Sequence, residues 1–132
     1  MMQGAEMATL KSYRELEVWK RSRVLVKSIY QFSKCYPREE KYGLSSQIRS
    51  AAVSVPGNIA EGYGRIHSGD YIHHLSMARG SLFELETYLI LSVDLEYCTK
   101  QEVSSLWKEV DEIGRMLSQL IIVLKKKREG GN

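Results

Sequence analysis

The side chains best suited to chemistry in this 132-residue chain are two groups of Lys and Arg. The first group recurs at helical spacing in the first quarter of the chain. At 100° per residue its members fall within about 60° of one another, next to the apolar arc of the same helix. The second group is a run of four consecutive cations near the C-terminus. Ammonium and guanidinium groups neutralise phosphates, so both groups are candidates for nucleic-acid binding. We call them the basic stripe, which comprises Lys20, Arg23, Lys27 and Lys34, and the basic run, which comprises Lys125, Lys126, Lys127 and Arg128.

An ordinary solvated helix face would carry the same cations, and the sequence leaves both interpretations open. The net charge of +3 is only mildly basic, so the total does not by itself indicate a nucleic-acid partner. The charge is unevenly distributed, because residues 10–35 hold seven Lys or Arg and two acids, whereas residues 67–98 hold one and five. Assembly of several copies would repeat the basic stripe and raise the local potential, which favours the phosphate-binding interpretation for an oligomer.

A second polar group falls where a buried apolar surface is expected. Arg79 and Glu86 lie seven residues apart within an apolar helical row of residues 72–93. A charge in a dry core costs several kcal/mol unless it is paired, so we expect Arg79 to pair with Glu86, Glu61 or Asn58. One interpretation is a structural network that fixes helix register or a subunit interface. The alternative is that Arg79 or Glu61 faces a cavity that receives a ligand.

Residue types that commonly catalyse or bind metals lack the necessary spacing. His67, His73 and His74 have no Glu-x-x-His partners, and Cys35 and Cys98 have no nearby Cys/His set with zinc spacing. The chain contains no Gly-x-Ser-x-Gly, no phosphate loop, no dinucleotide fingerprint and no paired inward carboxylates. We therefore predict no enzymatic activity, no metal and no cofactor. Free thiols are the expected state of the cysteines, although a bridge is conceivable if both lie at one end of the fold.

Hydrophobic periodicity predicts four helices that position these groups. Tyr36-Pro37 should end the first helix, and Pro56 should kink the second without breaking it. A capping box, Thr99-Lys-Gln-Glu102, should open the fourth, whose apolar residues follow an unbroken a/d pattern. The expected helices run from about Tyr13 to Cys35, from Glu39 or Leu44 to Gly62, from Ser68 or Asp70 to about Tyr97, and from Thr99 to about Arg128.

Short loops between helices of this length make neighbouring helices antiparallel. The predicted fold is therefore all-α, an antiparallel up-and-down four-helix bundle formed by residues 13–128. Residues 1–12 are expected to be a flexible N-terminus and residues 129–132 a flexible tail. The opening segment does not resemble a secretory signal, and no stretch approaches the ~18 apolar residues of a membrane span, so we expect a cytoplasmic protein.

Four segments, read in order, carry a family resemblance. They are Tyr-Arg-Glu-Leu-Glu-Val-Trp at residues 13–19, Tyr-Gly-Leu-Ser-Ser-Gln-Ile-Arg at 42–49, Ser-Val-Pro-Gly-Asn-Ile-Ala-Glu-Gly at 54–62 and Ala-Arg-Gly-Ser-Leu-Phe-Glu-Leu-Glu at 78–86. Together they make residues 13–125 resemble the four-helix-bundle family of bacterial rRNA intervening-sequence proteins. That family includes proteins similar to the accessory variability determinant of diversity-generating retroelements.

The resemblance implies a bundle that assembles into a homopentameric barrel with basic surfaces that bind nucleic acid. In the retroelement branch it also implies a reverse transcriptase as protein partner. By position, it assigns Asn58, Glu61, Arg79 and Glu86 to a polar network, and Arg49 and Arg65 to the basic surface.

The sequence thus favours a non-enzymatic, homo-oligomeric adaptor that binds RNA or another nucleic acid. Binding would be mainly to phosphates, so it would be weakly sequence-specific and would weaken as salt rises. The alternative is a protein-binding scaffold, for example for a reverse transcriptase, that does not bind nucleic acid directly. The acidic segment at residues 67–98 motivates this alternative.

Overall fold

The computed structural model describes residues 11–130, which form four α-helices and three single-turn 3-10 helices, with no strand in that range. The predicted all-α four-helix bundle is confirmed. Residues 1–10 and 131–132, which belong to the predicted flexible ends, lie outside the described residues. The α-helices are α2 (Glu17–Phe32), α3 (Leu44–Tyr63), α4 (Ser68–Asp94) and α5 (Lys100–Glu129), and the 3-10 helices are η1 (Tyr13–Glu15), η2 (Ser33–Cys35) and η3 (Arg38–Glu40).

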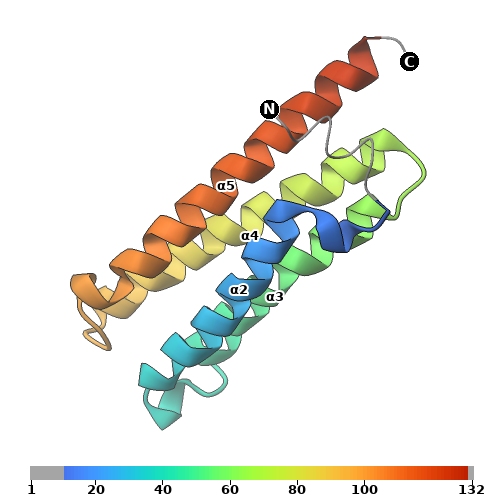
Figure 1. The fold of residues 1–132 in the computed structure, drawn as a ribbon. Helices are drawn as coiled ribbons and strands as arrows, with labels where there is room; N and C mark the ends of the chain where they lie inside the picture. Colours follow the sequence, from blue (N-terminus) through green and yellow to red (C-terminus); the bar gives the residue numbers. More distant parts are fainter. Residues whose placement is uncertain (1–10, 131–132) are drawn as a thin grey trace.

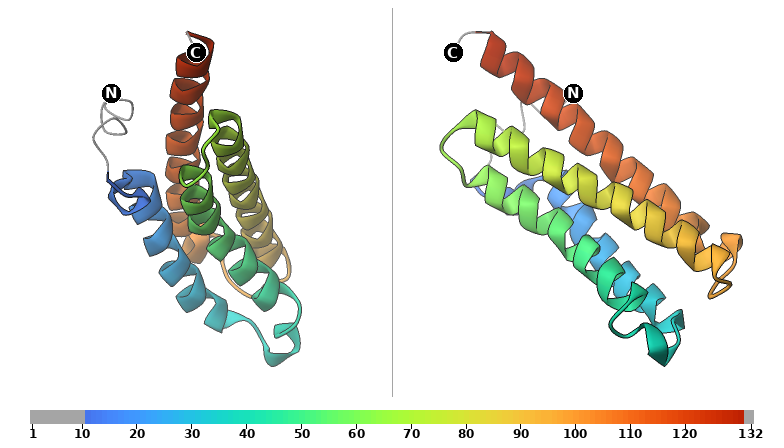
Figure 2. Two further views of the ribbon diagram at one scale, coloured as in Figure 1. Left: turned by 90° about the vertical axis from the view of Figure 1, so that its right-hand side faces the viewer. Right: turned by 180° about the vertical axis from the view of Figure 1, so that it is seen from behind.

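Each helix packs against two others. Consecutive helices run in opposite directions (Figures 1 and 2), and α2 also packs along α5, so the two helices that carry the basic stripe and the basic run are neighbours. α2 and α4 make no direct element-to-element contact. The last turns of α5 extend past the start of α2 (Figure 1). The N-terminal half of the basic stripe therefore lies toward the end of the bundle from which the basic run projects.

One apolar row from each helix forms the core. The row on α5 is buried as the a/d pattern predicted, and Ile113, Leu117 and Leu120 are fully inaccessible. α3 contributes small residues that allow α4 to approach closely. At Gly62, a Cβ atom would lie 2.8 Å from the His74 Cβ and 3.1 Å from the Tyr71 Cδ1, so only glycine fits this contact.

One helix begins later than predicted, and another begins at the later of two expected positions. Leu16 has an extended backbone (φ −70°, ψ 125°), which separates η1 from α2 and moves the start of α2 from Tyr13 to Glu17. α3 begins at Leu44, the later of the two expected positions, because the Glu40 carboxylate accepts a hydrogen bond from the Leu44 N–H at 2.9 Å. α3 continues through Pro56, and the predicted capping box of α5 is present.

The prediction for the buried row of α4 was wrong at two positions. Arg79 is exposed and Glu86 is only half-buried, whereas Ala78 and Leu85 are fully buried in their place. Both possible rows alternate steps of three and four and share the same leucines. Small residues at positions 78 and 81 fit against α3, and this contact rotates Arg79 and Glu86 out of the core toward α5. The shared leucines are Leu75, Leu82 and Leu89.

Candidate nucleic-acid interface

All four cations of the basic stripe are exposed. At 100° per residue they lie almost opposite the buried row of α2, so the stripe faces outward rather than beside the apolar face. The Arg23 guanidinium lies 5.6 Å from the centre of the Trp19 ring, and the Lys34 ammonium donates to Gln31 at 3.5 Å. No member of the stripe forms an ion pair within residues 11–130, so their charges face solvent uncompensated.

A further arginine on α2 has a structural role that the sequence reasoning missed. Arg21 faces α5, where its Nε donates to Glu109 at 2.9 Å and its Nη2 donates to Glu112 at 2.5 Å. The hydrogen bond from Arg21 lowers the pKa of Glu112, and the bond to Glu112 raises the pKa of Arg21. Glu109 and Glu112 are three residues apart, so their carboxylates lie near one another on α5. This spacing is the sequence signal that could have predicted their shared contact with Arg21.

Replacing Arg21 with Met should make stability less sensitive to acid. A carboxylate whose folded-state pKa is lowered stabilises the fold above its usual pKa, and this contribution is lost as pH falls. The wild type should therefore melt higher than Arg21→Met at neutral pH, by only a few degrees because the partners are partly exposed.

The difference between the two proteins should shrink as pH falls through about 4, near the ordinary pKa of a glutamate. Thermal melts followed by circular dichroism across this range measure it. If the difference in melting temperature stayed constant down to low pH, the Arg21 side chain would stabilise the fold by packing alone.

The basic run is the helical end of α5 rather than a loose extension. All four of its residues are exposed, and α5 continues to Glu129. Arg128 lies against the start of α4, because a Cβ on Gly69 would be 3.0 Å from its Nη1. Lys127 and Arg128 line a pocket of about 360 Å³ together with His67, Ser68, Gly69 and Leu124. This end of the molecule thus combines two cations with the positive end of the α4 dipole.

The two arginines assigned by resemblance to the basic surface are engaged within the bundle. Arg49 lies 4.7 Å from the centre of the Tyr30 ring and donates to the Ser33 Oγ at 2.7 Å, which joins α3 to α2. Arg65 pairs with Glu61 at 2.5 Å. Their charges are therefore partly used by the fold.

The predicted polar network exists only in part. The Asn58 Oδ1 lies 3.1 Å from the His74 Nδ1, and the His74 Nε2 lies 4.0 Å from the Glu61 carboxylate, so His74 joins Asn58 to Glu61 across α3 and α4. Sequence reasoning considered His74 only as a metal ligand and missed this link. Arg79 does not join them. Its guanidinium lies 5.4 Å from the centre of the Phe83 ring, so the predicted pairing with Glu86, Glu61 or Asn58 was wrong.

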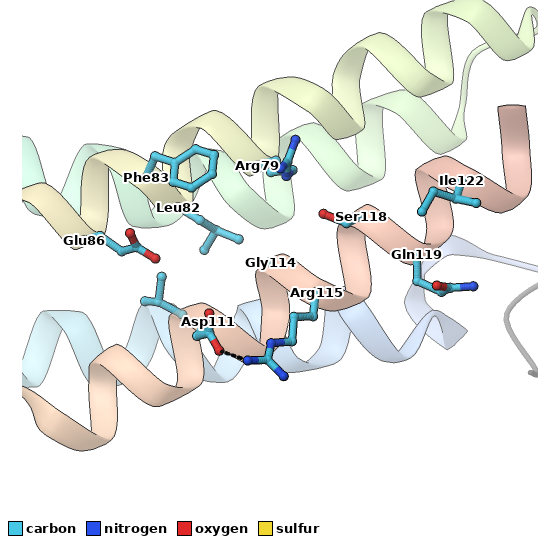
Figure 3. Close-up of a pocket in the computed structure, with 11 residues that line it drawn as sticks. Arg79, Leu82, Phe83, Glu86, Asp111, Gly114, Arg115, Ser118, Gln119 and Ile122 are labelled. Carbon is cyan, nitrogen blue, oxygen red and sulfur yellow. Dashed lines mark ion pairs between the residues drawn. The ribbon is translucent and has the colours of Figure 1, made fainter.

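Arg79 and Glu86 instead line a cavity of about 300 Å³ between α4 and α5 (Figure 3). Gly114 and Ser118 leave this space open because their side chains are short. Further along the same helices, Ile90 and Trp107 line a second cavity of about 370 Å³. We call the two cavities together the α4/α5 groove. Arg79 therefore faces a cavity, as its functional interpretation expected, and the binding of a ligand there stays a prediction.

Cysteine and metal chemistry receive no support from the geometry of the described residues. Cys35 and Cys98 are both free, and burial is the main cause that raises the pKa of each thiol and so lowers its reactivity. Within residues 11–130, no three His, Cys, Asp or Glu side chains gather as a metal-binding group. In the same range, no helix combines the length and apolarity that crossing a bilayer requires.

Comparison with known proteins gives a consistent result. Residues 14–119 match the family model described as 23S rRNA-intervening sequence protein. A crystal structure of a protein of unknown function from the S23 ribosomal protein family of Bacteroides thetaiotaomicron aligns with a TM-score of 0.73 and 26% sequence identity, covering 79% of this chain and 97% of that one. No curated protein matches the chain significantly. Neither match indicates an enzyme family.

Proposed function

Because the chain belongs to the 23S rRNA-intervening sequence protein family, we propose that it is a non-enzymatic, homo-oligomeric adaptor that binds RNA in the cytoplasm. The observation that carries this proposal is the placement of exposed cations on two adjacent helices, α2 and α5. The first turns of α2, which hold Lys20 and Arg23 in the sequence, lie toward the same end of the bundle as the last turns of α5. A phosphate backbone that follows this end would meet cations from both helices.

Aromatic residues beside these cations support RNA rather than a simple anion as ligand. Tyr13 and Trp19 pack edge to face with ring centres 5.2 Å apart, and together with Arg14, Lys20 and Arg23 they line an open hollow. Unpaired bases stack on such rings, and the neighbouring cations would hold the flanking phosphates. Single-stranded or loop regions of RNA suit this arrangement better than a continuous duplex.

Assembly would strengthen a surface of modest charge. A ring of identical subunits, a pentamer by family resemblance, repeats the cations at regular intervals around its axis. Each subunit has a net charge of only +3, but the repeated cations would raise the local potential that an extended RNA meets. Binding would rest on phosphate contacts and so discriminate weakly among sequences.

A salt titration of RNA binding tests this proposal. Fluorescence anisotropy of a labelled RNA hairpin should give a logarithm of affinity that falls linearly with the logarithm of salt, with a slope of about −3 to −5 for four to six phosphates. The unlabelled hairpin and an unrelated RNA of equal length should compete within a few-fold of each other. Absence of binding at low salt, or binding indifferent to salt, would contradict the proposal.

The competing proposal is a protein-binding scaffold, for example for a reverse transcriptase, without direct contact to nucleic acid. The exposed apolar side chains along the α4/α5 groove favour it. Substitutions in that groove would then abolish partner capture, whereas substitutions in the basic run would not. If substitutions in the basic run abolished partner capture and those in the groove did not, the RNA-binding adaptor would be favoured instead.

A further inference from the structure

The α4/α5 groove exposes more apolar surface than a solvated face requires. Phe83 is 54% exposed, Ile90 48%, Ile122 46% and Trp107 37%, and all four lie along the same pair of helices. Scattered exposed apolar residues are normal, but pairs of them that line two cavities between the same helices are typical of a binding surface. A surface between two neighbouring helices suits an added helix.

The groove is lined by as many cations as carboxylates, but two of its carboxylates, Glu86 and Asp111, lie close to one another. The cations are Arg79, Lys100 and Arg115. Glu86 projects from α4 toward Asp111 on α5 (Figure 3). Asp111 pairs at 3.1 Å with Arg115 of its own helix, but Glu86 forms no ion pair within residues 11–130. Burial and the charge of Asp111 both raise the pKa of Glu86, as expected for a carboxylate that lacks a cation. One helical turn beyond Ile90, Asp94 adds a further exposed carboxylate.

A complementary row lies on the outer face of α2. Val24 is 61% exposed, and Lys27 follows it three residues later on the same side of α2. Lys34 follows Lys27 after a further seven residues, just beyond α2 in η2. On α4, Glu86 and Asp94 follow Phe83 at nearly the same intervals, three and eight residues. Because α2 contacts α3 and α5 but not α4, this row cannot reach the groove of its own bundle.

We propose that the α4/α5 groove receives α2 of a second copy of this chain, with Val24 against Phe83 and Lys27 against Glu86 and Asp111. The same register brings Lys34 to Asp94. The inference rests on the self-assembly in the proposed function and names the surfaces that carry it. Lys27 would then lie between subunits, which leaves Lys20, Arg23 and the basic run for RNA.

The direction of the helices fits a closed ring. α2 and α4 run the same way within a bundle (Figure 1), so α2 of one copy lying parallel to α4 of the next keeps the bundle axes parallel. The donor row and the groove are different surfaces, so the contact is heterologous. A contact of that kind generates a ring when its rotation closes.

A charge swap tests this contact in the absence of RNA. Lys27→Glu and Glu86→Lys should each raise the dissociation constant between subunits by at least about tenfold, because each places like charges opposite one another. The double variant should return to within about threefold of the wild type, since it exchanges the two signs. Sedimentation velocity over a range of protein concentrations measures all four proteins.

Lys108→Glu and Glu39→Lys serve as matched controls, because both residues are exposed and neither lines the groove. They should assemble like the wild type. Single variants that assemble normally, or a double variant as weak as the singles, would overturn the proposed contact without contradicting the RNA-binding proposal. A wild type that is monomeric throughout would instead remove the self-assembly on which both proposals depend.

Cross-linking tests the register without relying on charge. In a background with Cys35→Ser and Cys98→Ser, one protein carries Val24→Cys and another carries Phe83→Cys. Oxidation of the mixture should give a cross-linked dimer that neither protein forms efficiently alone. Circular dichroism confirms that each variant is folded, and a folded mixture that yields no cross-linked dimer would contradict the proposed register.

Discussion

Leu85→Ala should lower the free energy of unfolding by about 2–5 kcal/mol, whereas Arg79→Ala should change it by less than about 0.5 kcal/mol. Leu85 is fully buried between helices, so its truncation removes apolar contacts and leaves a cavity. Arg79 is exposed, lines the groove and lies 5.4 Å from the centre of the Phe83 ring. The pair of substitutions therefore reports directly on the rotation of α4 about its axis.

Urea denaturation followed by circular dichroism measures both variants, at one protein concentration because assembly couples to stability. Leu85→Met serves as a control, since a swap that conserves volume should cost less than about 1.5 kcal/mol. If Arg79→Ala cost as much as Leu85→Ala, the row containing Arg79 and Glu86 would be the buried one, and the α4/α5 groove described above would not exist.

Removing three exposed lysines should reduce RNA affinity by about a hundredfold at physiological salt. The variant combines Lys20→Gln, Lys125→Gln and Lys126→Gln, which remove cations from both helices of the proposed interface. Each lost phosphate contact should also reduce the slope of the logarithm of affinity against the logarithm of salt concentration by about one. The slope of the triple variant should therefore be smaller in magnitude by about three. The wild type and the variant should converge at high salt, where phosphate contacts contribute little.

A triple control removes the same charge elsewhere, with Arg38→Gln, Lys41→Gln and Lys108→Gln. All three are exposed and lie outside the proposed RNA surface. The control should lose only the small, long-range part of the attraction, a few-fold in affinity, and keep most of the wild-type salt slope. Equal losses in the two triple variants would mean that RNA responds to net charge and not to this surface.

The helices could be predicted from the sequence wherever a single hydrophobic pattern was present. On α5, apolar residues keep a/d spacing from Val103 to Leu124, and Thr99 with Glu102 forms the predicted capping box. On α3, Pro56 lies within a helix that the surrounding apolar spacing predicted to be continuous. In these cases the local signal and the tertiary packing favour the same structure.

On α4, hydrophobic periodicity alone was not sufficient to predict which face of the helix is buried. Two rows share the same leucines, and they differ in whether position 78 or 79 and position 85 or 86 face the core. Spacing alone cannot distinguish them. The choice depends on α3, where Ser54 and its neighbours are small enough for Ala78 and Ser81 to pack closely, and Ser81 hydrogen-bonds to Ser54. If the packing surface of α3 had been known, Arg79 would have been predicted to be solvent-exposed.

The polar contacts were the least predictable part of the candidate site. Arg21 binds Glu109 across 88 residues of sequence, and His74 binds Asn58 across a loop between helices. Neither partner can be chosen before the relative rotation of two helices is known. By contrast, the basic stripe could be recognised from the spacing within a single helix, although the structure places it opposite the buried row of α2 and not next to it.

Whether this bundle assembles and uses its exposed cations to hold RNA can be decided by measuring its mass in solution. Light scattering of the wild type with and without a short structured RNA, from about 50 mM to about 200 mM salt, follows both properties at once. We expect a particle of several subunits that gains the mass of RNA at low salt and loses it as salt rises, without losing its own subunits. A particle whose mass does not change when RNA is added, at any salt concentration, would contradict it.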